Sequence, residues 1–513
     1  MNALIGNSLN SFFSWYMEKR LHEIEEFIKD PICTQEKILF QNLEKAKNTA
    51  FGLNFGFKEI NNSDQLKDRV PLHEYHDLFH DIERMKKGEP HVLWPGHVSW
   101  FAQSSGTVSG MIKHIPITKE SLMECHYKGG KDLLSLYYRE NPSTTLFRGK
   151  HLIASGSLNS FTGSKKTIIG DLSAIIMQHL PWWCEWRRSP RGVGKLTSKD
   201  WNEKLNYICH TSSRDDIHLI AGVPSWILMI IKRIIEQNNV HNIHEVWPNF
   251  ELFLHGGTSI NSYLPLFKEL FGKPINYYQN YNATEGYFGL QQNNEDKDML
   301  LMLDYGIYYE FIKKEDWHDD QPNTISLLDV ELNEPYEMVI TTNGGLWRYR
   351  TKDTILFTQT YPFKIKVCGR TQLFLNQFGE EVMVDHLEQT ILDVQNLTHS
   401  KINEFMVSFN MSNSKFENIG QHHWVIEFEK PPSDIHQFIQ TVDSKLQKNN
   451  IDYKAKRKNN NPLGFPRVTI VEKGSFFNWM KKRGKLGGQH KVPRIDGSNT
   501  FINDIIKISN KNC

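Results

Sequence analysis

Small hydroxyl side chains and glycines are concentrated in FAQSSGTVSG, residues 101–110. Ser104, Ser105 and Thr107 offer hydroxyl donors, and Gly106 lets the backbone point N–H groups at an anion. Strand-like residues flank this run on both sides, which predicts a loop between two strands. The Walker A consensus is absent. The segment indicates a phosphate-binding loop, although a solvated turn is the more common role of such a cluster.

A second group of reactive side chains is Tyr281, Thr284 and Glu285 in YNATEGYFG, residues 281–289. The aromatic run before it favours a strand, and ligands of α/β proteins collect where such strands end. A tyrosine ring can stack on adenine, and a carboxylate can hold Mg²⁺ beside a triphosphate. The alternative is a strand edge with a surface glutamate.

The third group lies in LWRYRTKDTILF, residues 346–357, where Arg348, Arg350 and Asp353 interrupt an apolar hairpin pattern. Such charges are costly to bury unless they are paired. A structural Arg–Asp pair would satisfy them. The functional alternative is an aspartate that accepts ribose hydroxyls while an arginine neutralises phosphate.

The elements that position these residues follow an α/β pattern. Residues 1–90 are mostly of helical type, and helical and strand-like runs alternate from about residue 91. FELFL, residues 250–254, predicts a buried strand that ends near two glycines. Asn343-Gly344-Gly345 predicts a hairpin turn. This alternation favours a layered sheet-and-helix core.

The pattern changes near residue 370 to that of a small α+β unit. It predicts a short hairpin and a helix over 369–391, a strand at 422–430, a helix at 433–450 and a strand at 467–476. A chain of 513 residues is long for a single core. We therefore expect two domains, residues 1–369 and 370–513.

Composition excludes several classes of protein. The 60 Lys plus Arg nearly balance the 59 Asp plus Glu, so the net charge of +1 favours neither nucleic acid nor an anionic membrane as a partner. Six dispersed cysteines form no zinc or redox motif and are expected to be reduced thiols. The longest apolar stretch, residues 219–231, is shorter than the ~20 residues of a membrane span. A cytoplasmic protein is expected.

The order of the three motifs, a Ser/Thr/Gly loop, then YxxTE, then RYRxxD, resembles that of adenylate-forming enzymes. The chain is similar over nearly its whole length to the plant-type acyl-acid amido synthetases, the Gretchen Hagen three family. GVPSWI (222–227), LHGG (254–257) and GGQHKVPR (487–494) also resemble landmarks of that family. The resemblance implies a large N-terminal domain of the adenylate-forming type and a small mobile C-terminal domain. It also implies adenylation of a carboxylic acid with ATP and Mg²⁺, followed by transfer to an amino acid amine.

The resemblance also implies roles for single residues. For ATP they are Ser104, Ser105, Gly106 and Thr107 at the phosphates, Tyr281 at the adenine, Thr284 at the α-phosphate, Asp353 at the ribose, and Gly256 and Gly257 where the backbone passes the adenine or acyl phosphate. Glu285 would hold Mg²⁺, and Lys491 would swing in to the phosphates as a mobile point charge. Val223 and Trp226 would line the acyl pocket.

Two departures from the family pattern concern the third motif. Lys352 stands where the family usually has glycine, and a left-handed backbone there costs a lysine about 1–2 kcal/mol. Gly369-Arg370 resembles the hinge of the wider superfamily, where Arg370 would contact ribose or form a structural salt bridge. An acyl-CoA ligase and a nucleotide-binding protein without turnover remain alternatives. The sequence identifies neither the acid nor the amine, and we expect a monomer or a weak homodimer.

Overall fold

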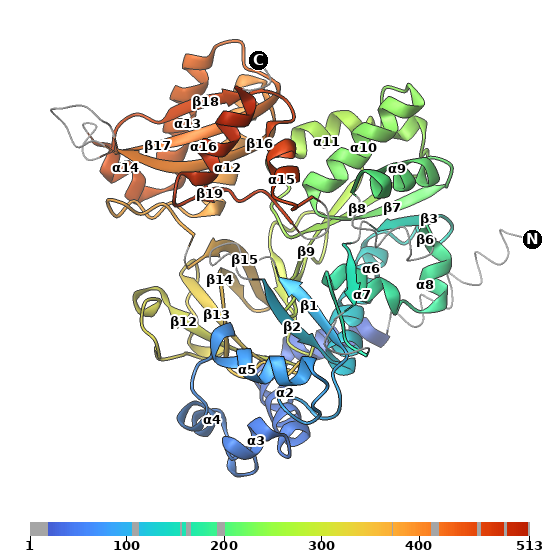
Figure 1. Cartoon of the computed structure of the whole chain (residues 1–513), viewed down its shortest axis with the longest axis vertical. Coiled ribbons are helices and arrows are strands. Elements are labelled where there is room, and N and C mark those ends of the chain that lie inside the picture. Colours follow the sequence, from blue (N-terminus) through green and yellow to red (C-terminus); the bar gives the residue numbers. More distant parts are fainter. Residues whose placement is uncertain are drawn as a thin grey trace, which may run out of the picture.

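The computed structural model describes residues 19–104, 112–153, 156–160, 166–191, 201–371, 373–411, 420–458, 463–486 and 490–510. Within these ranges the chain forms a large N-terminal part on an 11-stranded sheet and a smaller C-terminal part on a four-stranded sheet (Figure 1). The last strand of the large sheet, β15 (Phe363–Arg370), ends where the sequence changes character. The first helix of the C-terminal part, α12 (Val384–Thr398), begins soon after it.

The large sheet has the order β12-β13-β14-β15-β11-β10-β9-β8-β7-β3-β6. Neighbours from β6 to β9 are parallel, and those from β9 to β12 are antiparallel. The carboxyl ends of β7, β8 and β9 therefore meet at one edge. The other strands are β3 (Lys150–Ile153), β6 (Arg188–Ser189), β7 (Ile217–Gly222), β8 (Leu252–Gly256), β9 (Asn276–Asn282), β10 (Tyr287–Leu290), β11 (Met299–Leu301), β12 (Ile307–Lys313), β13 (Pro335–Thr342) and β14 (Tyr349–Thr360).

A second sheet of the N-terminal part has the order β2-β1-β5-β4 and carries the Ser/Thr/Gly segment. β1 and β2 are antiparallel, and Ser104 at the end of β1 is paired with Lys113. The two predicted flanking strands are confirmed, and the residues between them, 105–111, lie outside the described residues. The strands are β1 (Trp100–Ser104), β2 (Lys113–Ile117), β4 (Leu158–Ser160) and β5 (Ile168–Gly170).

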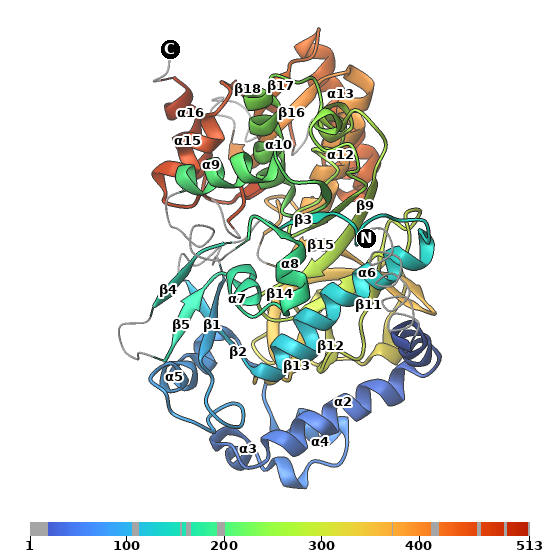
Figure 2. The same cartoon turned by 90° about the vertical axis from the view of Figure 1, so that its right-hand side faces the viewer.

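Helices cover the large sheet, and Figure 2 shows α6 and α2 lying across the strands below α9 and α10. Helix α10 begins with Pro224, which is favoured in the first turn, and buries isoleucines at helical spacing. The helices are α2 (Pro31–Ala46), α3 (Ala50–Asn54), η1 (Phe57–Glu59), α4 (Ser63–Arg69), α5 (Tyr75–Lys86), the π-helix η2 (Ser121–Tyr127), α6 (Lys128–Glu140), α7 (Leu172–Gln178), α8 (Trp182–Arg187), α9 (Trp201–Ser212), α10 (Pro224–Asn238), η4 (Ile243–Glu245), α11 (Leu264–Phe271), η5 (Lys314–Asp316) and η6 (Leu327–Asp329).

The C-terminal sheet, of order β18-β17-β16-β19, is covered on both faces. Trp424 and Ile426 of β17 pack with α12 and α13, whereas Val425 between them packs with α15 and α16. This alternation follows from the two-residue repeat of a strand. The elements are β16 (Lys401–Met411), β17 (Gly420–Lys430), α13 (Ile435–Asn449), α14 (Ile451–Arg457), β18 (Arg467–Val471), α15 (Ser475–Lys482), β19 (Ile495–Asp496) and α16 (Thr500–Ser509).

One predicted strand of this part is too long. The strand expected at 467–476 ends at Val471, and α15 begins at Ser475. Gly474 has a φ of +86°, a left-handed conformation that ends the extended backbone and starts the helix. The strand predicted at 422–430 and the helix predicted at 433–450 are confirmed.

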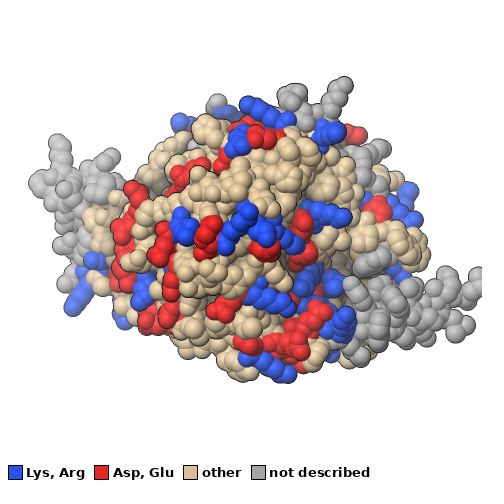
Figure 3. All heavy atoms as spheres, turned by 90° about the horizontal axis from the view of Figure 1, so that it is seen from below, with Lys and Arg blue, Asp and Glu red and all other residues tan. Residues whose placement is uncertain are grey.

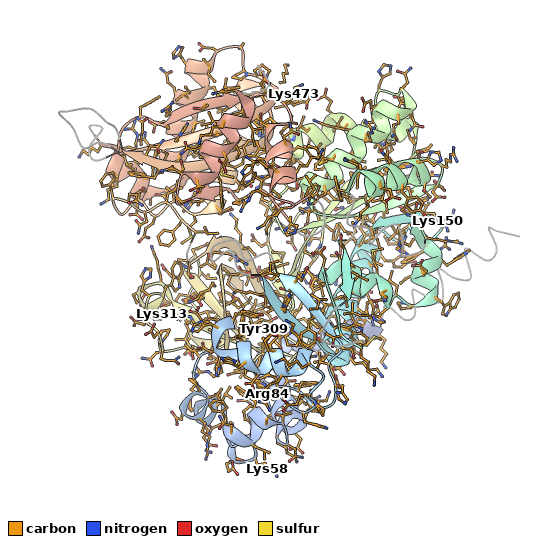
Figure 4. All side chains as sticks on the ribbon, viewed as in Figure 1. Lys58, Arg84, Lys150, Tyr309, Lys313 and Lys473 are labelled. Carbon is orange, nitrogen blue, oxygen red and sulfur yellow. The ribbon has the colours of Figure 1, made fainter. Side chains whose placement is uncertain are left out.

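Charge and apolar side chains are distributed as in a folded globular chain. On the face drawn in Figure 3, acidic and basic side chains are interspersed over the surface. Figure 4 places Tyr309 of β12 inside the large domain, where it is 1% exposed. Among the described residues, none of the helices combines the length and apolar character that a membrane span requires.

Candidate active site

Side chains from β9, β14 and β15 meet in one cluster, formed by Tyr281, Asp353 and Arg370. The Tyr281 hydroxyl donates to Asp353 Oδ2 at 2.6 Å. Arg370 Nε lies 2.8 Å from Asp353 Oδ1, because the two residues are register partners on β14 and β15. Burial, with the nearby Asp353 carboxylate, raises the pKa of Tyr281 well above its ordinary value. The second and third sequence motifs therefore share one polar cluster.

The glycine pair lies at the carboxyl end of β8, beside this cluster. A Cβ on Gly256 would stand 2.6 Å from the backbone oxygen of Asn280 on β9, so only glycine fits between the two strands. Gly257 has a φ of +79°. Its carbonyl accepts a hydrogen bond from Lys491 Nζ. The C-terminal domain thus delivers its lysine to the strand edge of the N-terminal domain.

Lys491 is half-buried at this junction. Burial and the neighbouring Arg370 cation lower its pKa from 10.5 to about 8, and the Asp353 carboxylate opposes part of that change. A lysine in this setting holds a positive charge that lacks its full hydration. It is suited to meet an anion that brings several negative oxygens.

The lowered pKa of Lys491 predicts that the rate of adenylate formation depends on pH. The ammonium is charged below about pH 8 and loses its proton above it. If the cation offsets phosphate charge, kcat/KM for ATP in adenylate formation falls as pH rises through about 8, since this ratio reports free-enzyme pKa values. Rates from about pH 6.5 to 9.5 would show the fall. Lys491→Arg should hold its rate through this range because arginine stays charged. A flat wild-type profile would contradict the prediction.

Thr284 and Glu285 occupy the tight connection between β9 and β10. The buried Thr284 hydroxyl donates to Glu285 Oε2 at 2.6 Å. The π-helix η2 supports both ends of the connection. Its His126 Nδ1 lies 3.1 Å from Asn282 Oδ1, and Cys125 Sγ accepts from the Tyr287 N–H at 3.1 Å. A single turn of π-helix is often found at functional sites.

The arginines of RYRxxD do not pair with Asp353. Arg348 binds Glu310 with two nitrogens at 2.9 and 3.0 Å, and Arg350 binds Glu337 with two at 2.9 Å. All four side chains are buried. The structural Arg–Asp pair considered from the sequence is therefore wrong. Both guanidiniums are committed to glutamates on β12 and β13, which leaves Arg370 as the arginine beside Asp353.

Val223 and Trp226 lie at the start of α10, facing residues 490–494. This segment, which contains Lys491, is called the lysine loop below. Val223 Cγ2 is 3.4 Å from the Cβ position of Gly257. The Trp226 ring meets Trp201 edge to face at 4.7 Å, and its indole N–H donates to the His490 carbonyl at 2.7 Å. Trp226 is thus buried against Trp201 and anchors the residue before Lys491.

Arg494, which sequence reasoning did not identify, holds the lysine loop between the domains. Its guanidinium binds Glu388 Oε1 at 2.5 Å and Glu404 Oε2 at 2.6 Å within the C-terminal domain. It also donates to the Tyr263 hydroxyl of the N-terminal domain at 2.8 Å. The side chain of Gln395 donates to the Ser262 carbonyl at 2.9 Å beside it. This cluster fixes the chain three residues after Lys491.

Of the four residues predicted in the Ser/Thr/Gly loop, one lies within the described residues. Ser104 is half-buried at the end of β1, whereas Ser105, Gly106 and Thr107 lie outside the described residues. A pocket beside Lys491 has four lining side chains able to carry positive charge and no acidic one; it is lined by Met480, Arg483, Lys485, His490, Lys491, Pro493 and Phe501. The pocket therefore suits anionic oxygens.

Comparisons with known proteins find one family over most of the chain. Models of the GH3 family match its N-terminal domain over residues 20–275, its central domain over 300–370 and its C-terminal domain over 385–499. The Arabidopsis thaliana protein named indole-3-acetic acid-amido synthetase GH3.4 is 24% identical, over 93% of this chain and 91% of its own length.

Solved structures share the fold. The AtGH3.15 acyl acid amido synthetase in complex with 2,4-DB has a TM-score of 0.78 at 19% identity, with 96% of both chains covered. A 2-hydroxyisobutyryl-CoA ligase in the postadenylation state with 2-HIB-AMP has a TM-score of 0.53 at 11% identity, covering 96% of this chain and 91% of that chain. The predicted α/β fold, with a large adenylate-forming domain and a small C-terminal domain, is confirmed.

Proposed function

The chain belongs to the GH3 family, and we propose that it is an ATP-dependent acyl acid amido synthetase. It adenylates a carboxylic acid and transfers the acyl group to the amine of an amino acid. The observation that carries the proposal is Lys491, which reaches from the C-terminal domain to Gly257 beside Asp353 and Arg370. A cation that one domain brings to the polar cluster of the other suits an adenylyl transfer followed by an acyl transfer, because it can offset phosphate charge in the first step.

The proposed nucleotide site uses the residues that the resemblance to the family implies. Asp353 accepts from the ribose hydroxyls, and the Tyr281 ring lies by the adenine. Thr284 donates to the α-phosphate. Ser104 with Ser105, Gly106 and Thr107 binds the outer phosphates, and Lys491 offsets their charge. Gly256 and Gly257 keep the strand edge free of side chains, so the acyl phosphate can approach the backbone.

Glu285 is the residue proposed to hold Mg²⁺. Among the residues that the structure describes, no group of three or more His, Cys, Asp or Glu side chains could hold a metal. Mg²⁺ is commonly held by one or two carboxylates together with substrate phosphates, so a single glutamate fits an ion that enters with ATP. The bound ion would offset phosphate charge.

The reaction has two half-reactions in one site. In the first, a carboxylate oxygen attacks the α-phosphorus, the bond to pyrophosphate breaks, and acyl-AMP forms. In the second, an amine attacks the acyl carbonyl, the bond to AMP breaks, and the amine loses a proton. Positioning and charge neutralisation supply most of the acceleration. We propose that the C-terminal domain rotates near Arg370 to withdraw Lys491 between the two steps.

The first half-reaction predicts acid-dependent exchange of labelled pyrophosphate into ATP. Each acid of a panel that includes aryl, indolyl and fatty carboxylates is incubated with enzyme, ATP, Mg²⁺ and labelled pyrophosphate. At least one acid should raise exchange above the acid-free rate, because acyl-AMP formation is reversible. No exchange across the whole panel would overturn adenylation.

The second half-reaction is tested by the mass of the product. With the active acid, a pooled amino acid mixture should give an amide and stoichiometric AMP. A thioester formed with CoA, and no amide, would make the chain an acyl-CoA ligase instead. Bound nucleotide without AMP formation would make it a binding protein.

The cysteines within the described residues are free thiols, which fits the cytoplasmic location that we propose.

A further inference from the structure

Lys352 is a non-glycine residue in a left-handed backbone conformation, next to the ribose-binding Asp353 of the proposed function. Its φ is +63°. The strand pairing shifts there, since Glu337 faces Thr354 whereas Val339 faces Arg350. Glycine adopts such a conformation without strain, and lysine does not. A strained residue of this kind persists only where its surroundings hold it in place.

The Lys352 side chain is held by two carboxylates. Its ammonium lies 2.6 Å from Glu74 Oε1 and 4.0 Å from Glu337 Oε1. The side chain is only 14% exposed, so solvent screens the Glu74 pair less than it would a pair on the open surface. Glu337 is already bound by Arg350. The pair with Glu74 is therefore the one that depends on Lys352, and it links β14 to Glu74.

Glu74 connects this strand to helix α5. It is the N-cap residue of α5, and its N–H donates to Asp77 Oδ2 at 2.7 Å. The preceding His73 pairs with β14, donating to the Arg348 carbonyl at 2.9 Å and accepting from the Arg350 N–H at 2.8 Å. The start of α5 thus lies along β14 two residues before Lys352.

The Lys352 backbone supports the other side of the cluster. Its carbonyl accepts from the Thr371 N–H at 3.0 Å, directly after Arg370. Arg370 and Tyr281 both bind the Asp353 carboxylate. Lys352 is therefore attached through its side chain to α5 and through its carbonyl to the strand end that carries Arg370.

We infer that Lys352 is a positioning residue, which uses its ion pair with Glu74 to fix the Asp353 carboxylate for the ribose of ATP. The inference rests on the proposed function. Asp353 would bind the ribose equally in the ground state and the transition state. We call this Lys352–Glu74 ion pair the tether. Its loss should therefore raise KM for ATP and leave kcat little changed.

The test compares four single variants by calorimetric AMP binding, ATP kinetics and thermal unfolding. Lys352→Gly removes the tether and the backbone strain together, so its Tm should not fall while its Kd for AMP rises roughly tenfold, as couplings within one ion-pair network do. Glu74→Gln leaves the backbone untouched and should weaken AMP binding similarly. Lys352→Arg keeps the charge and should bind as wild type does. Asn333→Gly, at a φ of +62° away from the site, is the matched backbone control and should not alter binding.

A double variant decides between a tether and two independent effects. Lys352→Gly with Glu74→Gln should bind AMP no more weakly than either single variant, because one interaction can be lost only once. Additive losses, or wild-type binding by Glu74→Gln, would overturn the inference. If wild-type protein bound no adenine nucleotide, the proposed function would fall and the inference with it.

Discussion

Lys491→Ala is expected to slow acyl-adenylate formation by roughly 10²–10³-fold, the size of effect seen when one preorganised electrostatic donor is removed. The Lys491 ammonium reaches Gly257 at the junction of the domains and lies beside a pocket without acidic side chains. Among the described lysines of the C-terminal domain, Lys491 is the one that donates a hydrogen bond to the Gly257 carbonyl. Acid-dependent pyrophosphate exchange and the pre-steady-state burst of pyrophosphate measure the loss.

The assignment of Lys491 to the first step gives a sharper expectation. With acyl-adenylate supplied from outside, Lys491→Ala should form amide at close to the wild-type rate, because the phosphates have already left. Lys482→Ala, which removes an exposed lysine at the end of α15, is the control and should slow neither step. Equal slowing of both steps by Lys491→Ala would remove its proposed role.

The sequence was informative where chemistry and local structure coincide. Asn343-Gly344-Gly345 predicted a hairpin, and β13 and β14 are the antiparallel strands that it joins. The predicted FELFL strand corresponds to β8, which ends at Gly256, one residue before the left-handed Gly257. Turn residues and apolar runs report on neighbours a few positions away. The elements that carry Asp353 and the glycine pair could therefore be predicted.

The sequence was uninformative where partners lie far apart along the chain. Arg348 and Arg350 stand near Asp353 in sequence, but strand register places them against Glu310 and Glu337. Successive side chains of a strand point to opposite faces, so a nearby charge in sequence is often out of reach. Nothing in the pattern around Glu310 or Glu337 marks these residues as partners. Their pairing depends on the order of strands, which a single sequence does not specify.

Arg494 shows the same limit at the junction of the domains. In the sequence it is only the last residue of GGQHKVPR, whereas in the structure it lies at the centre of a cluster with Glu388, Glu404 and Tyr263. Its partners come from α12, β16 and the residue before α11. A sequence signal that could have indicated it is its spacing of three residues from Lys491, since a mobile lysine needs a fixed neighbour.

Arg494→Met is expected to destabilise the protein by about 3–5 kcal/mol, the usual result of removing one member of a buried ion pair. The buried carboxylate of Glu388 and that of Glu404, which is 12% exposed, would lose their common cation. Burial already raises the pKa of Glu404, so part of the loss would be met by protonation of that carboxylate. Urea unfolding at about pH 7 measures the change. Arg467→Met, at an exposed position of β18, should stay within about 0.5 kcal/mol of wild type.

Tyr263→Phe separates the contact between domains from the ion pairs, because it removes only the hydroxyl that Arg494 reaches across the junction. Tyr263→Phe should be much more stable than Arg494→Met, because both ion pairs remain. It should still slow adenylation, since Lys491 would be held at Gly257 for a smaller fraction of the time. Combining Glu388→Gln with Glu404→Gln in the Arg494→Met background should recover stability, because no unpaired carboxylate remains. If Tyr263→Phe adenylates at the wild-type rate, the cluster stabilises the C-terminal domain without holding Lys491 in the site.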